Sequence, residues 1–179
     1  MIYSEGKIGR VFIIRLEDGD EIPSCIEKFA IEKDIRAGLT IMIGGIWKGE
    51  VVVGPRKSEI MPPDPMLLPL DEAHEVVGVG ILAPDKNGRP VLHIHAALGR
   101  SGQTITGCLR KGVKTWLMGE VIHGDYRLRA NAEMLDSVTN YECYKGLYSS
   151  HVDKNYFEIA YALNRQFGDG GLYRALPLY

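Results

Sequence analysis

Residues 91–110, VLHIHAALGRSGQTITGCLR, alternate in polarity so regularly that they constrain the fold more than any other stretch. The first half has apolar residues at every second position, namely Leu92, Ile94, Ala96 and Leu98. The second half has a matching set, namely Ile105, Gly107 and Leu109. A period of two is that of a strand with one buried face, and a serine-glycine pair between the halves suits a tight turn. The stretch therefore predicts a β-hairpin.

Matching the two apolar sets fixes the register of this hairpin. Even-numbered positions face the core on the first strand and odd-numbered positions face it on the second, so the numbers of two paired residues must add up to an odd sum. A two-residue turn at Ser101 and Gly102 satisfies this rule and pairs His95 directly with Cys108. His93 then lies diagonal to Cys108, at a Cβ separation of about 7–8 Å. Two imidazoles and one thiol are predicted to gather on one patch of the sheet.

Imidazole and thiolate groups are the ligands that Zn²⁺ and similar divalent transition metals prefer. Three protein ligands leave one tetrahedral position open, which is typical of a catalytic zinc that lowers the pKa of a bound water. An interpretation without metal stays open. His-x-His on a sheet can be two hydrogen-bonded imidazoles, and Cys108 can serve as a small apolar side chain. The spacing alone does not decide between these interpretations.

The remaining periodicity predicts an α+β fold, with one long N-terminal helix on a mostly antiparallel sheet. The helix is expected over residues 22–35, because apolar residues recur there at helical spacing, Pro23 suits its first turn and Gly38 suits a C-terminal cap. Further strands are expected at residues 8–16, 39–47, 50–53, 75–83 and 113–122. Residues 54–70 contain five prolines, which lack the backbone N–H group that pairing within a sheet requires. These prolines predict an extended surface loop there.

The C-terminal part of the chain is predicted to be an appendage. We expect the α+β domain to span residues 1–147 and a C-terminal helical extension to span residues 148–179. Ser150 and Asp153 form a capping box for this second helix, and Gly168 marks its end.

Composition excludes several classes of function. The net charge is −2, so no overall basic field attracts the chain to nucleic acid or to an anionic membrane. The longest run of low polarity, residues 37–47, is too short to span a bilayer. Three widely spaced cysteines favour a reducing, cytoplasmic setting. GVGILA at residues 78–83 has the letters of a dinucleotide fingerprint, but Pro84 follows where a helix would have to begin.

The segment HEVVGVGILAPDKNGRPVLHIHAALGRSGQTITGCLRKG, with GEVI further on, resembles the plant-and-prokaryote conserved domain, or PPC domain. The likeness covers residues 8 to about 147. It implies an α+β homotrimer and a metal site on His93, His95 and Cys108, with the cysteine standing where prokaryotic members commonly have a third histidine. A thiolate is softer than imidazole and is still a competent zinc ligand. Plant members join this domain to DNA-binding AT-hooks, but this chain has no convincing AT-hook.

Two hypotheses about function follow. The first is a homotrimeric, cytoplasmic metalloprotein that, if it is an enzyme, acts on a small molecule, with Glu120, His123 or Asp125 as proton carriers. Both faces of the strand at 113–122 are apolar, which suggests burial under a neighbouring subunit. The alternative is a DNA-associated oligomerisation module, suggested by the family and by the basic residues between Arg100 and Arg129.

Overall fold

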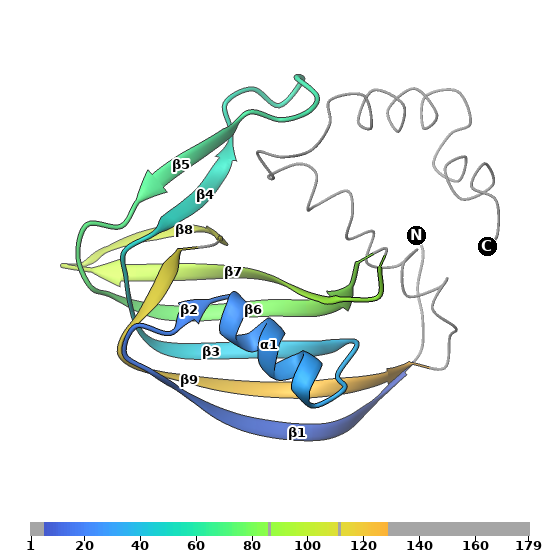
Figure 1. Cartoon of the computed structure of the whole chain (residues 1–179). Coiled ribbons are helices and arrows are strands. Elements are labelled where there is room, and N and C mark those ends of the chain that lie inside the picture. Colours follow the sequence, from blue (N-terminus) through green and yellow to red (C-terminus); the bar gives the residue numbers. More distant parts are fainter. Residues whose placement is uncertain (1–5, 86, 111, 129–179) are drawn as a thin grey trace, which may run out of the picture.

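The computed structural model describes residues 6–85, 87–110 and 112–128 (Figure 1). The domain end expected near residue 147 and the helical extension expected over residues 148–179 lie outside these residues. Among the described residues, no helix is both long enough and apolar enough to cross a membrane.

Nine strands form one sheet in which every pairing is antiparallel. The sheet order is β1-β9-β3-β6-β7-β8-β4-β5, and β2 pairs with β9 beside this path. The elements are β1 (Gly6–Glu17), β2 (Glu21–Ile22), α1 (Ser24–Glu32), β3 (Gly38–Trp47), β4 (Glu50–Pro55), β5 (Pro65–Pro69), β6 (His74–Pro84), β7 (Pro90–Arg100), β8 (Gln103–Leu109) and β9 (Val113–Leu128). The α+β class with a mostly antiparallel sheet is confirmed.

The prediction of a long helix is wrong, because α1 has only nine residues. Ile22 belongs to β2, and the helix begins after Pro23. At its other end Asp34 takes a left-handed conformation, with φ 50°, and the amide of Ile35 donates to the carbonyl of Ala30 at 2.8 Å. This conformation and this bond close the helix end. Ile35 still packs in the core, so the apolar pattern continues beyond the helix.

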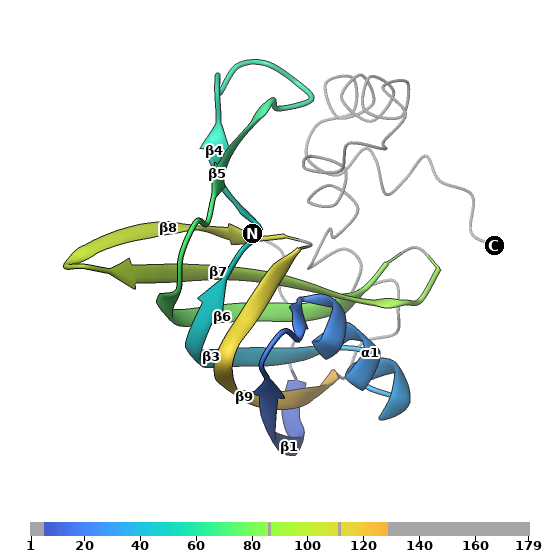
Figure 2. The ribbon, with the colours of Figure 1, turned by 60° about the vertical axis from the view of Figure 1, so that its left-hand side comes forward.

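The proline-rich segment also differs from its prediction, because part of it is a strand. Among the described strands, β5 pairs only with β4 and lies at the edge of the sheet. Proline is tolerated on an edge strand, where its missing N–H leaves no ladder bond unmade. Figure 2 shows the β4–β5 arm standing away from the plane of the main sheet.

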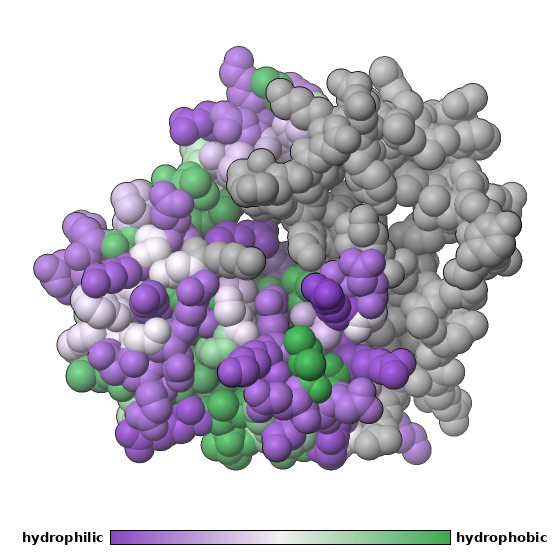
Figure 3. Space-filling model, in the orientation of Figure 1, coloured by the Kyte–Doolittle hydropathy of each residue, from purple (hydrophilic) through white to green (hydrophobic). Residues whose placement is uncertain are grey.

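The two faces of the main sheet have different surroundings. One face lies under α1 and forms the core, with Met42, Ile94 and Val121 fully buried against Ile26 and its neighbours on the helix. The side of the molecule that carries α1 is largely hydrophilic on its outer surface (Figure 3). No described element packs over the opposite face, which we call the open face.

The open face is apolar and continuous across the sheet. The pairings align one cross-strand row over six strands: Ile13, Ile122, Ile41, Val79, His95 and Cys108. The four aliphatic residues of this row are between 40% and 77% exposed. Val77, Ile81 and Ile43 extend the same surface on adjacent rows. The predicted ligands His95 and Cys108 therefore stand at one end of an uncovered apolar surface.

Candidate metal centre

The hairpin of β7 and β8 has the predicted register. Leu98 pairs with Ile105, and His95 pairs with Cys108. The turn is formed by Ser101 and Gly102, which both have positive φ, of 50° and 77°. Two consecutive residues with positive φ define the turn whose twist matches that of a β-hairpin. The local turn chemistry thus brings the thiol opposite the imidazoles.

The three predicted ligands form one cluster. One donor atom from each of His93, His95 and Cys108 lies within 4.8 Å of the other two. The two Nε2 atoms are 3.0 Å apart. Tetrahedral zinc with ordinary bond lengths needs about 3.3 Å between two nitrogens and about 3.6 Å between nitrogen and sulfur. Small side-chain adjustments would satisfy this geometry, so the donor set fits a divalent transition metal.

The cluster opens into a cavity of about 270 Å³, lined also by Val52, Val53, Gly54, Thr106 and Gly107. β4 forms one wall, because Val52 pairs with Cys108. This close approach requires glycine at position 107, where a Cβ atom would collide with the carbonyl oxygen of Val52. Cys108 is consequently buried, while His93 is half-buried and His95 exposed. The metal position is accessible from the open face.

The electrostatic environment favours the ligand form of both imidazoles. Burial, the neighbouring His95 and the Arg110 guanidinium lower the pKa of His93 to about 4. Burial and Arg110 also lower the pKa of His95. Burial raises the pKa of the Cys108 thiol, and Arg110 partly opposes this. Neutral imidazoles bind metals directly, whereas the thiol must lose its proton.

The alternation predicted Arg110 on the same side of the hairpin as Cys108 but gave it no role at the site, although its charge acts on all three residues of the cluster. A signal was present in the sequence, because Arg110 follows Cys108 by two positions and so continues the same side of the alternation.

The structure does not bring the three predicted proton carriers to this cluster within one chain. Glu120 is exposed on the open face, in the row next to that of His95. Its strand β9 is separated from β7 by β3 and β6, which corresponds to about 14 Å. Glu120 is therefore too far from its own chain's histidines to share a proton with them.

His123 and Asp125 lie on the opposite face of the sheet, beneath α1. His123 is fully buried, and its Nδ1 lies 2.8 Å from Oγ1 of Thr40. Asp125 accepts hydrogen bonds from N and Nε of Arg10 at 2.9 Å and 2.7 Å. Arg10 also donates to the carbonyl of Lys33 at the end of α1. These residues join the helix to the sheet, on the side away from the metal cluster.

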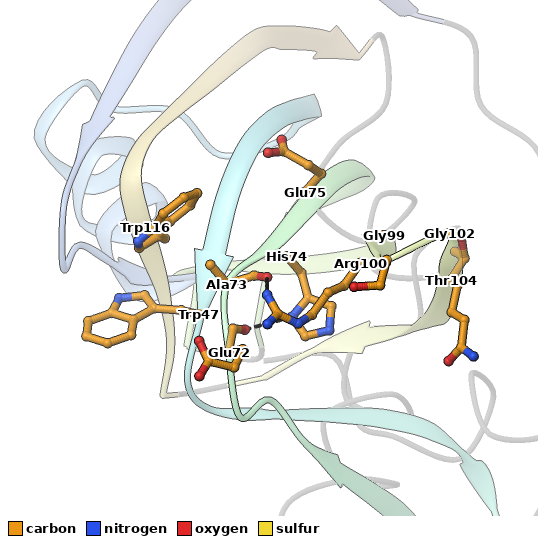
Figure 4. A pocket seen from close by; sticks show the side chains of 12 residues that line it. Trp47, Glu72, Ala73, His74, Glu75, Gly99, Arg100, Gly102, Thr104 and Trp116 are labelled. Carbon is orange, nitrogen blue, oxygen red and sulfur yellow. Dashed lines mark hydrogen bonds between the residues drawn. The ribbon is translucent and has the colours of Figure 1, made fainter.

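A larger cavity, of about 820 Å³, lies at the turn end of the hairpin (Figure 4). Two of its polar side chains are bonded to nearby backbone. Arg100 donates to the carbonyl of Ala73 at 2.9 Å, and Nδ1 of His74 lies 2.8 Å from the carbonyl of Glu72. These contacts hold the chain as it enters β6, and they support a structural role for His74. The smaller cavity is the one that carries the donor cluster.

Several solved structures share the fold. A metal-containing protein of Archaeoglobus fulgidus is 25% identical, with a TM-score of 0.63 over 73% of this chain and 89% of that one. A plant- and prokaryote-conserved protein of Pyrococcus horikoshii is 20% identical, with a TM-score of 0.61 over 73% and 87%. A candidate DNA-binding protein of Bacteroides thetaiotaomicron is 24% identical, with a TM-score of 0.56 over 68% and 83%. No curated protein matches the sequence.

The sequence itself matches one family. The profile of the Plants and Prokaryotes Conserved (PCC) domain, the PPC domain named above, aligns with residues 3–126, which is more than half of the chain. The matched region contains the whole described sheet apart from the end of β9, together with the donor cluster. On this match, the chain belongs to the Plants and Prokaryotes Conserved domain family.

Proposed function

We propose that this protein is a homotrimeric metalloprotein in which His93, His95 and Cys108 hold a divalent transition metal, with zinc as the first candidate. The observation that carries the proposal is the convergence of three soft donors within 4.8 Å at the mouth of a cavity. The Archaeoglobus protein, described as metal-containing, has the same fold at 25% identity. A reducing cytoplasm keeps the Cys108 thiol available as a ligand.

The arrangement of the cluster and its cavity favours the binding or conversion of a small molecule. Three protein ligands leave one position of a tetrahedral site open, where a bound metal supplies Lewis acidity. The cavity is slightly below the usual volume range of ligand pockets, so it admits only a small group. Thr106 offers a hydroxyl in its wall, and the Arg110 charge favours an anionic or polar ligand. The residues thus provide binding and orientation around one open position.

The test is elemental analysis of protein purified without a histidine tag. We expect one equivalent of a transition metal per chain in the wild type. His95→Ala and Cys108→Ser should each weaken binding by more than about 100-fold, because removing a ligand costs more than the 10–100-fold loss seen for outer-shell partners. Cys25→Ser is the matched control, because Cys25 is the other free cysteine in the described part of the chain.

Two results would contradict the proposal. One is wild-type protein that retains no metal after dialysis against buffer containing trace zinc. The other is equal metal loss in the Cys25 control and the Cys108 variant, which would indicate nonspecific binding by thiols.

The alternative is a DNA-associated oligomerisation module, for which the support is the plant members of the family and the name of the Bacteroides protein. The net charge of −2 opposes it. Gel shifts over a salt series distinguish the two functions, since a protein that contacts phosphates loses affinity steeply as salt rises. Absent or salt-insensitive binding excludes the alternative.

A further inference from the structure

We infer that each metal centre is completed by a second copy of the chain, whose Glu120 carboxylate occupies the open position beside His93, His95 and Cys108. This inference rests on the proposed metal function and extends it. It assigns a ligand that no single chain can supply to its own cluster.

The first step is the position of the cluster on the open face. His95 pairs with Val79, which pairs with Ile41, so the imidazole continues an apolar row without a break. Val79 and Ile41 are 56% and 40% exposed in the single chain. A contiguous exposed apolar surface of this kind marks an interface. A partner that covers Val79 also reaches the edge of the metal cluster.

The second step is that the open face has two dissimilar halves. The half on β1, β9 and β3 carries Ile13, Ile122 and Ile41 around Glu120. The half on β6, β7 and β8 carries Val77 and Val79 beside the metal cluster. In a closed ring of identical subunits, one patch of each copy packs against a different patch of the next copy. Such a ring places the Glu120 half of one copy over the cluster half of its neighbour.

The third step is charge. Glu120 stands between Ile43 of β3 and Arg15 of β1. The Arg15 side chain is ion-paired with Glu17 at 3.2 Å, and within the described residues Glu120 forms no hydrogen bond and no ion pair. Burying a carboxylate in an apolar interface is costly unless an opposite charge faces it. On the proposed function, the other half would provide that charge through a divalent metal held by the cluster, with the Arg110 guanidinium nearby. Both halves are apolar, and their charges are complementary. This argues that a second copy of the chain covers the open face.

The experiment uses mixed assemblies of the full-length chain. One chain carries His95→Ala and keeps Glu120, the other carries Glu120→Gln and keeps its cluster, and the two carry different tags that contain no histidine. Each variant alone should bind metal at least about 10-fold more weakly than the wild type, because each site lacks a ligand. A mixed ring contains one junction where an intact cluster meets an intact Glu120. We therefore expect one tightly bound metal per mixed trimer after chelator dialysis.

Light scattering and a matched control accompany this measurement. Glu32→Gln removes a carboxylate from α1, on the other side of the sheet, and should leave metal affinity unchanged. Glu120→Asp keeps a shorter carboxylate and should retain more affinity than Glu120→Gln, which separates a ligand from a packing residue.

The outcomes separate this inference from the proposed function. Wild-type affinity in Glu120→Gln, or no recovery in the mixed trimers, overturns the shared site and leaves metal binding intact. A monomeric wild type also overturns it and assigns the open face to another occupant, such as residues 129–179 of the same chain. A wild type that binds no metal removes both proposals.

Discussion

Histidine occurs on both faces of this sheet, and its burial and its neighbours differ between the two faces. His123 is fully buried under α1, where it meets Thr40. His93 and His95 stand on the open face, with their Nε2 atoms 3.0 Å apart and a thiol nearby. A buried imidazole bonded to a neighbouring hydroxyl serves the fold, whereas paired imidazoles beside a cavity are available to a ligand. The face of the sheet on which a histidine lies therefore indicates its role better than the residue type does.

The sharpest test of this comparison uses two consecutive residues of β3. Met42 is fully buried beneath α1, while Ile41 is 40% exposed on the open face. Met42→Glu places an unpaired carboxylate in the core and should cost more than about 4 kcal/mol of unfolding free energy. Ile41→Glu should cost about 1 kcal/mol or less in the isolated chain and should dissociate the proposed trimer. Urea unfolding and light scattering measure the two effects. Equal unfolding by both variants would mean that the chain itself covers the open face.

An intermediate effect is expected from a substitution of Asp125, which binds Arg10 of the neighbouring strand β1 on the helix side of the sheet. Asp125→Ala removes two hydrogen bonds that involve charged groups, and should lower the unfolding free energy by about 2–3 kcal/mol without changing the metal affinity. Asp64→Ala is the control, because the Arg56–Asp64 ion pair is exposed, at 64% and 65%, and should contribute less than about 1 kcal/mol. A loss of metal in Asp125→Ala at a pH where the chain is folded would contradict the separation of the two faces.

The smallest effect is expected from the ionisation of His123. Burial lowers its pKa below the ordinary value of 6.5, and the Asp125 carboxylate partly opposes this. Below about pH 6.5 the unfolded chain therefore binds a proton on His123 that the folded chain does not. The free energy of unfolding consequently decreases as the pH is lowered, by at most about 1.4 kcal/mol per pH unit. His123→Asn keeps a polar group near Thr40 and removes this contribution. Urea titrations between about pH 5 and pH 8 should show a shallower acid loss in the variant. An unchanged slope would show that His123 takes up its proton in the folded state.

Local patterns explain which parts of the fold could be predicted. The register of β7 and β8 follows from the period of two and from the turn at Ser101 and Gly102. Both features lie within twenty consecutive residues, 91–110. The end of α1 was mispredicted because Ile35 continues the apolar pattern after the helix has ended. The strand β5 was missed because prolines exclude a central strand but not an edge strand, and edge position is not a local property.

The same distinction applies to the candidate site. The sequence by itself determined that His93, His95 and Cys108 share one side of a hairpin, because alternation and turn chemistry act between near neighbours. Only the tertiary structure decided that Glu120 shares the open face at a distance of three strands, while His123 and Asp125 lie under the helix. The order of strands and the placement of α1 depend on contacts between residues far apart in the chain. Those contacts determine which face is buried under α1 and which face the described residues leave uncovered.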